Sequence, residues 1–140
     1  MPIRTEVGHR HAHQIIDTLR WALEERGAGA AVAVTDPHGE LVALLRTDGC
    51  PLPSINNAIH KAFTAAREGV ESAVIGERSR REGFPMTNFG DLRYTAWGGG
   101  VPIVDDGRVI GAVGVSGLPE AEDVELARLG AAVEADGAGR

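Results

Sequence analysis

The sequence predicts an α+β fold in which helices cover one antiparallel sheet of about five strands. Apolar residues recur at helical spacing near the N-terminus and again in the middle of the chain. The pair Asp106-Gly107 separates two apolar runs, which is the strongest short-range signal for a β-hairpin. The resulting order is helix, hairpin, helix, short helix, three strands and helix, which favours an α+β domain over alternating βαβ units.

The length and composition of the chain exclude several classes of function. The chain has 140 residues, enough for one domain with a normal core, and no linker or repeat divides residues 1–140. A formal net charge of −6 argues against nucleic acid as a partner. No apolar run approaches the roughly 18 residues of a membrane span, and the first residues lack the basic and apolar pattern expected of a signal peptide. Cys50 is the single cysteine, so we expect no disulfide and a cytoplasmic location.

Capping residues and periodicity set the expected elements. Thr5, Ser54 and Ser72 are expected to cap the first three helices, and Pro119 suits the first turn of the last one. The sequence predicts helices over 6–26, 55–68, from Ser72 and over 119–135, and strands over 30–35, 40–46, 93–97, 101–105 and 108–116. The loop over 83–92 is rich in apolar residues, so it either packs into the domain or covers a pocket.

Glycines are concentrated around the predicted hairpin. Gly98-Gly99-Gly100 has no side chains to cover its N–H groups, and such a turn can bind an anion. It lacks the Lys-Ser/Thr ending of a P-loop. Gly111 and Gly114 interrupt the apolar return strand, which indicates a close approach to the backbone there. The partner is either a helix that crosses the sheet or a bound ligand.

Several short motifs resemble the GlcG/HbpS family, also described as the haem-degrading or DUF336 family. They extend from about residue 10 to 135, and it is their combination that is specific. The motifs are Asp36-Pro37-His38-Gly39-Glu40-Leu41, Arg46-Thr47-Asp48-Gly49, Ser54-Ile55 with Ala58, Lys61-Ala62, Thr64-Ala65, Gly98-Gly99-Gly100-Val101-Pro102-Ile103, and Gly111-Ala112-Val113-Gly114-Val115-Ser116-Gly117.

The resemblance implies a profilin-like fold and a homo-oligomer, from dimer to octamer. It also implies that the ligand is haem in some members, of which some degrade it. Two positions depart from the family pattern: Thr47 stands where a methionine is frequent, and Trp97 where a phenylalanine is frequent. Haem ligation varies among members, so no axial ligand is transferred by position.

The first functional hypothesis is a protein that binds haem or another carboxylate-bearing small molecule. Haem needs an axial donor, an apolar slot and cations for its propionates. His60 is the best internal donor. The expected pocket lies between the second helix and the Trp97–Gly100 turn, with the loop over 83–92 as its cover. The candidate ligand-binding residues are Arg46, His60, Lys61, Thr64, Phe89, Arg93, Trp97, Gly98, Gly99 and Gly100.

The second hypothesis is a small cofactor-independent enzyme, of isomerase, hydratase or lyase type, that acts on a small carboxylic acid. It would need a general base, a cation and an oxyanion site. His60, Asp91 or Tyr94 is the candidate for moving the proton, and Lys61 or Arg93 for the cation. Cys50 is also considered as a nucleophile, and a buried apolar role suits a lone cysteine as well. A third hypothesis is a structural or regulatory subunit without a ligand.

Charged and imidazole groups provide two further expectations. Lys61 and Arg93 are expected to form an anion-recognising pair, because strand alternation would place Arg93 and Trp97 on one face. His9 and His13 are four residues apart on the first helix and are candidates for a shared metal. No third ligand is found at matching spacing, and a solvated helix start is the alternative.

Overall fold

The computed structural model describes residues 5–136. Its order is α1 (His9–Arg26), β1 (Ala31–Thr35), β2 (Leu41–Arg46), α2 (Ser54–Glu68), α3 (Ser72–Glu82), the 3-10 helix η1 (Met86–Phe89), β3 (Gly100–Asp105), β4 (Arg108–Ser116) and α4 (Glu120–Ala131). None of the described helices has the length and apolar character needed to cross a membrane.

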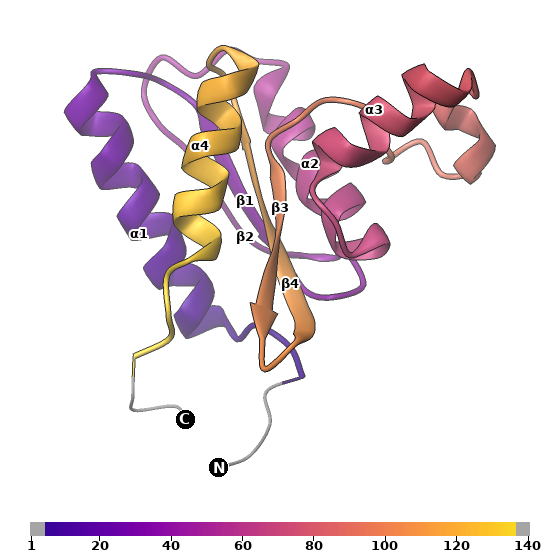
Figure 1. Ribbon diagram of the computed structural model, residues 1–140. Coiled ribbons are helices and arrows are strands. Elements are labelled where there is room, and N and C mark those ends of the chain that lie inside the picture. The colour runs from indigo at the N-terminus through magenta and orange to yellow at the C-terminus, as the bar shows by residue number, and fades with distance from the viewer. Residues whose placement is uncertain (1–4, 137–140) are drawn as a thin grey trace.

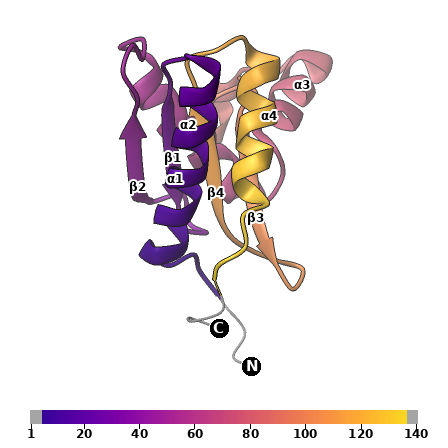
Figure 2. The ribbon, with the colours of Figure 1, turned by 90° about the vertical axis from the view of Figure 1, so that its left-hand side faces the viewer.

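The domain is a three-layer arrangement around one antiparallel sheet with strand order β2-β1-β4-β3. Helices α1 and α4 cover one face and α2 crosses the other, while α3 projects beyond α2 (Figures 1 and 2). The two faces of the sheet differ in the size of their side chains. Branched side chains such as Val32 and Val34 contact the α1/α4 side, whereas small ones such as Ala31 and Ala33 lie under α2. The α+β prediction is confirmed.

The described sheet has four strands, so the expected fifth strand over 93–97 is wrong. Backbone groups in this segment bind side chains of neighbouring helices instead of another strand. The N–H of Thr95 donates to Oγ1 of Thr64 in α2, and Oγ of Ser72 in α3 donates to the carbonyl of Trp97. With these groups occupied, the segment follows α2 as an irregular connection.

The three predicted N-terminal caps are also wrong. Ser72 is the first residue of α3, and Glu71 occupies the cap position. Helix α1 begins at His9 after Gly8, without a side-chain cap, because the preceding Val7 is buried and its N–H donates to the carbonyl of Ile110 in β4. Ser54 is the first residue of α2 itself and caps nothing, since Pro53 occupies the cap position.

Of the two interrupting glycines, Gly114 is explained by the crossing of α2 over the sheet, whereas a Cβ at Gly111 would meet the carbonyl of Thr35 in β1. A Cβ at Gly114 would overlap the backbone carbonyl of Ala58, and one at Gly100 would overlap that of Lys61. Of the two explanations for a close approach, the structure shows the crossing helix at Gly114. The hairpin turn follows the prediction, with positive φ at Asp106 (51°) and Gly107 (75°), as type I′ requires.

Candidate functional site

A cavity of about 400 Å³ lies between the N-terminal half of α2, Trp97 and the β4–α4 connection. This volume is within the range of small-molecule pockets. Trp97 is 61% exposed beside it, an unusual position for so large an apolar side chain. The lining residues are Pro51, Pro53, Ser54, Asn57, Lys61, Trp97, Ser116, Gly117, Leu118, Glu120 and Asp123.

The floor of the cavity contains a buried ion pair. Nζ of Lys61 lies 3.1 Å from Oδ2 of Asp123 and donates a second hydrogen bond to the carbonyl of Val115 at 3.0 Å. Asp123 also accepts the N–H of Leu118. Burial raises the pKa of the Asp123 carboxyl, and the charge and hydrogen bond of Lys61 oppose that rise. The pair therefore ties α2, β4 and α4 together beneath the cavity.

Lys61 thus occupies a different position from the ligand-binding cation that the sequence predicts. Its side chain is 1% exposed, and its charge is neutralised by Asp123 inside the protein. An ammonium that is buried and paired in this way costs much less than an unpaired one, but it is not free to recognise an external anion without breaking the pair.

The N–H groups of the glycine turn are largely occupied as well. Gly98 donates to Oε2 of Glu120 at 2.7 Å, and Gly100 donates to Oγ of Ser72 at 2.9 Å. The anion that this turn can bind is therefore a carboxylate of the chain itself. We correct the expectation that Gly98–Gly100 presents open donors to a ligand.

Arg93 is held at a distinct cluster near the turn between β1 and β2. It donates to both carboxylate oxygens of Asp91, at 3.1 and 2.9 Å, and to Glu40 at 3.1 Å, and it stacks 4.0 Å from the ring centroid of Phe63. Hydrogen bonds from Arg93 lower the pKa of Asp91 to about 2. Lys61 and Arg93 share none of these partners, so the structure does not bring the expected pair of cations together.

The loop over 83–92 is held at the same cluster by aromatic contacts. Phe89 stacks on Tyr94 with ring centroids 4.3 Å apart, and Tyr94 meets Phe63 edge-on at 5.5 Å. Phe84 in turn contacts Phe89. No residue of 83–92 is among those that line the cavity, so this loop is not its cover.

Two of the proposed proton-moving groups do not suit that role near neutral pH. Asp91 stays ionised because its pKa is lowered to about 2. Burial and the hydrogen bond to Glu68 raise the pKa of Tyr94 to about 12, so its phenol stays neutral. General acid–base catalysis works best with a pKa near the operating pH.

His60 lies on α2 within reach of the Arg93 charge, and it is not among the residues that line the cavity. It is half-buried and three residues after Asn57, so the two are neighbours on the surface of α2. Burial and the nearby Arg93 charge lower the pKa of His60, which favours the neutral imidazole. Thr64, by contrast, is fully buried. Its hydroxyl donates to the His60 carbonyl and accepts from Thr95, so it presents nothing to a ligand.

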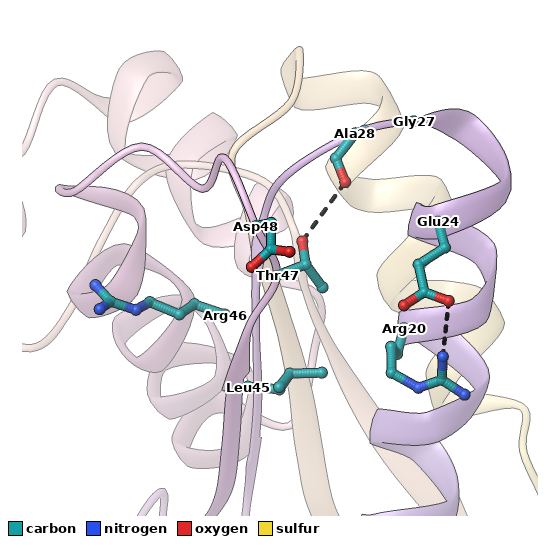
Figure 3. A pocket seen from close by; sticks show the side chains of 8 residues that line it. All are labelled: Arg20, Glu24, Gly27, Ala28, Leu45, Arg46, Thr47 and Asp48. Atoms are coloured by element: carbon teal, nitrogen blue, oxygen red, sulfur yellow. Dashed lines mark hydrogen bonds and ion pairs between the residues drawn. The ribbon is translucent and has the colours of Figure 1, made fainter.

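Arg46 lines a separate cavity of about 370 Å³ between the end of α1 and the end of β2. Figure 3 shows its guanidinium pointing away from Leu45, Arg20 and the α1 side of this cavity. Glu24 there is paired with Arg20 at 2.7 Å. Arg46 pairs with Ala31, which α2 covers, so its side chain leaves β2 on the α2 side of the sheet, as that of Ser116 leaves β4. It is not among the residues that line the cavity beside Trp97.

The exposed histidines of α1 are not part of a metal-binding cluster among the described residues. His9 and His13 are exposed, and within residues 5–136 no group of three or more His, Cys, Asp or Glu residues could hold a metal. His11 between them is 5% exposed and bonds through Nε2 to the carbonyl of Val133, which joins α1 to the end of α4.

Five further residues line the cavity that the sequence did not predict: Ser54, Asn57, Ser116, Glu120 and Asp123. A signal existed for Asp123. It precedes the buried Leu126 and Ala127 by three and four residues, so it lies on the apolar face of α4, where a carboxylate requires a buried partner. No local pattern identifies the serines.

These features define a class of protein: a small α+β domain with a ligand-sized cavity beside the helix that crosses its sheet. A family model described as "Haem degrading protein HbpS-like" matches residues 7–132, and the chain belongs to this family. It is 34% identical over 122 residues to protein GlcG of Escherichia coli K12, a match that covers 83% of this chain and 85% of GlcG.

Solved structures of similar fold agree with this assignment. A double mutant of Streptomyces reticuli HbpS superposes with a TM-score of 0.83 at 28% identity, covering 94% of this chain and 89% of HbpS. A haem complex of PduOC gives a TM-score of 0.82 at 22% identity, covering 91% and 94% of the two chains. At 22% identity, the similarity to PduOC shows a shared fold.

Proposed function

We propose that this protein binds haem, or another flat molecule that carries a carboxylate, in the cavity between α2 and Trp97. The observation that carries the proposal is the cavity itself, with an exposed indole on one side and buried polar groups at its floor. Ligand pockets combine apolar walls with a few well-placed polar groups in the same way. The haem complex of a structural neighbour supports haem as the first ligand to test.

Haem binding requires a side chain that can serve as an axial ligand of the iron. The residues that line the cavity include no His, Cys, Met or Tyr, so none of them is a usual axial ligand. The candidate donor is His60, three residues after the cavity-lining Asn57 on α2, and its lowered pKa favours the neutral imidazole that ligates iron. His60 would hold the iron, and Trp97 would provide the flat apolar contact. Bound haem would supply the redox and ligand chemistry of its iron.

A hemin titration followed by the Soret absorption tests the proposal. We expect a saturable complex in the wild type and a displaced Soret band with weaker binding in His60→Ala. His13→Ala, which removes an exposed histidine of α1, should leave both unchanged. Identical spectra and affinities for the wild type and His60→Ala would contradict the role of His60. The absence of a saturable complex would contradict haem as the ligand.

A further inference from the structure

We infer that the cavity has a carboxylate subsite at the N-terminus of α2, formed by the backbone N–H groups of Ile55 and Asn56 together with the hydroxyls of Ser54 and Ser116. This inference rests on the proposed function, because it specifies how the same cavity recognises its ligand. It assigns the anion contact to these neutral donors, whereas Lys61, Arg93 and the glycine turn, the expected anchors, are occupied by partners within the chain.

The start of α2 is an open anion site by its geometry. It has no side-chain cap and no acidic residue in its first turn. The N–H groups of Ser54 and Asn57 donate to the carbonyls of Pro51 and Pro53, which leaves those of Ile55 and Asn56 without a backbone partner among the described residues. Unpaired N–H groups and the helix dipole both favour a negative charge at this point.

Two buried hydroxyls are a second and independent indication. Ser54 is 6% exposed and Ser116 is 4% exposed, and both line the cavity. Within residues 5–136 neither hydroxyl has a hydrogen-bond partner, although buried polar groups normally have one. Among the described residues, only the hydroxyl of Thr35 is both fully shielded from solvent and without a hydrogen-bond partner. The hydroxyl oxygens of Ser54 and Ser116 therefore remain accessible from the cavity.

The sheet register places the Ser116 side chain on the face of the sheet that α2 covers. Ser116 pairs with Ala31, and Ala31 belongs to the apolar cluster that α2 covers. Its hydroxyl therefore leaves β4 on the side of α2, toward the same cavity that Ser54 lines from the helix. Asn57, one turn further along α2, adds a side-chain amide to the same wall.

The other charges in the cavity restrict the ligand further. Asp123 is neutralised by Lys61, whereas Glu120 has one oxygen on the N–H of Gly98 and is itself exposed. A second anionic group near Glu120 would be repelled. The cavity therefore suits a monocarboxylate whose remaining part is apolar and flat enough to lie against Trp97, or the single propionate end of a larger ligand.

Benzoate is a suitable probe, with benzamide as its uncharged counterpart. Titration into the ¹⁵N-labelled protein should shift the backbone amide resonances of Ile55 and Asn56 with benzoate but not with benzamide. Ser54→Asp places a carboxylate of the chain at the helix start, where an acidic residue is compatible with folding. It should weaken benzoate binding at least about tenfold, the scale of one lost charge-assisted hydrogen bond. Ser116→Ala should weaken it by a smaller factor.

Thr87→Asp, on the exposed 3-10 helix, is the charge-matched control and should bind benzoate like the wild type. If benzoate shifts Trp97 and Leu118 but not Ile55 and Asn56, and Ser54→Asp binds normally, the subsite is overturned while the cavity remains a ligand site. If neither benzoate nor hemin shifts any residue that lines the cavity, the proposed function itself is overturned.

Discussion

At the scale of single residues, the chemistry-bearing side chains found in the sequence are mostly used inside the protein. Lys61 neutralises Asp123, Arg93 is held by Asp91 and Glu40, and Glu120 occupies the glycine turn. The sequence identifies Lys61, Arg93 and the glycine turn as candidates, but their partners Asp123, Glu40 and Glu120 lie 22 to 62 residues away. Such pairings depend on the completed fold, which local patterns do not contain.

The pairing of Asp91 with Arg93 predicts a specific pH dependence of stability. The folded state lowers the Asp91 pKa from 3.8 to about 2, so this contribution is fully present above 3.8 and is lost as the pH falls toward 2. Asp91→Asn keeps an acceptor for the Arg93 backbone N–H but removes the charge. It should lower the urea midpoint at pH 7, and its difference from the wild type should shrink with acidification.

The exposed Asp48, changed to Asn, is the control for this measurement and should leave the urea midpoint nearly unchanged at both pH values. A deficit of Asp91→Asn that stays constant from pH 7 to pH 2 would show that the ion pair is not its cause.

At the scale of elements, the sequence predicts what is locally encoded. The hairpin of β3 and β4 follows from its turn residues and apolar runs, and Arg108–Ser116 has the predicted bounds. Residues 93–97 have a composition suited to a strand but form none, because Thr64 and Ser72 satisfy their backbone. The cap predicted at Thr5 is wrong for a similar reason. The N–H of Val7 bonds to β4, so α1 begins only at His9.

The close crossing of α2 makes Gly114 essential for the stability of the domain. In Gly114→Ala the new methyl group would overlap the carbonyl of Ala58, and α2 would have to move away from β4. We expect a loss of about 3 kcal/mol in the free energy of unfolding, the upper part of the range for overpacked cores. Urea denaturation followed by circular dichroism measures this loss.

Gly8→Ala provides the comparison, because a Cβ at Gly8 meets no atom within 4 Å. Its expected loss is limited to the weaker capping preference of alanine, about 1 kcal/mol. Equal losses for the two variants would mean that the crossing tolerates a methyl group and that Gly114 has no packing role.

At the scale of the whole molecule, the domain exposes apolar residues that a single copy leaves uncovered. Leu41 and Leu44 on the outermost strand β2 are 46% and 39% exposed, and Leu92 is 87% exposed. Symmetric assembly would bury surface of this kind. The homo-oligomer therefore stays a prediction: light scattering at micromolar concentration should give a mass that is a multiple of 14.7 kDa, and a monomer alone would contradict it.

If a flat ligand binds against Trp97 in the cavity beside α2, the two tryptophans of the chain allow a direct test. Trp97 and Trp21 are both 61% exposed, but Trp21 lies on α1 and lines no part of that cavity. Hemin affinity is measured by Soret titration for the wild type, Trp97→Ala and Trp21→Ala. We predict about tenfold weaker binding for Trp97→Ala, consistent with an aromatic contact worth roughly 1.5 kcal/mol, and wild-type binding for Trp21→Ala. Wild-type affinity in Trp97→Ala would contradict binding of the ligand against Trp97.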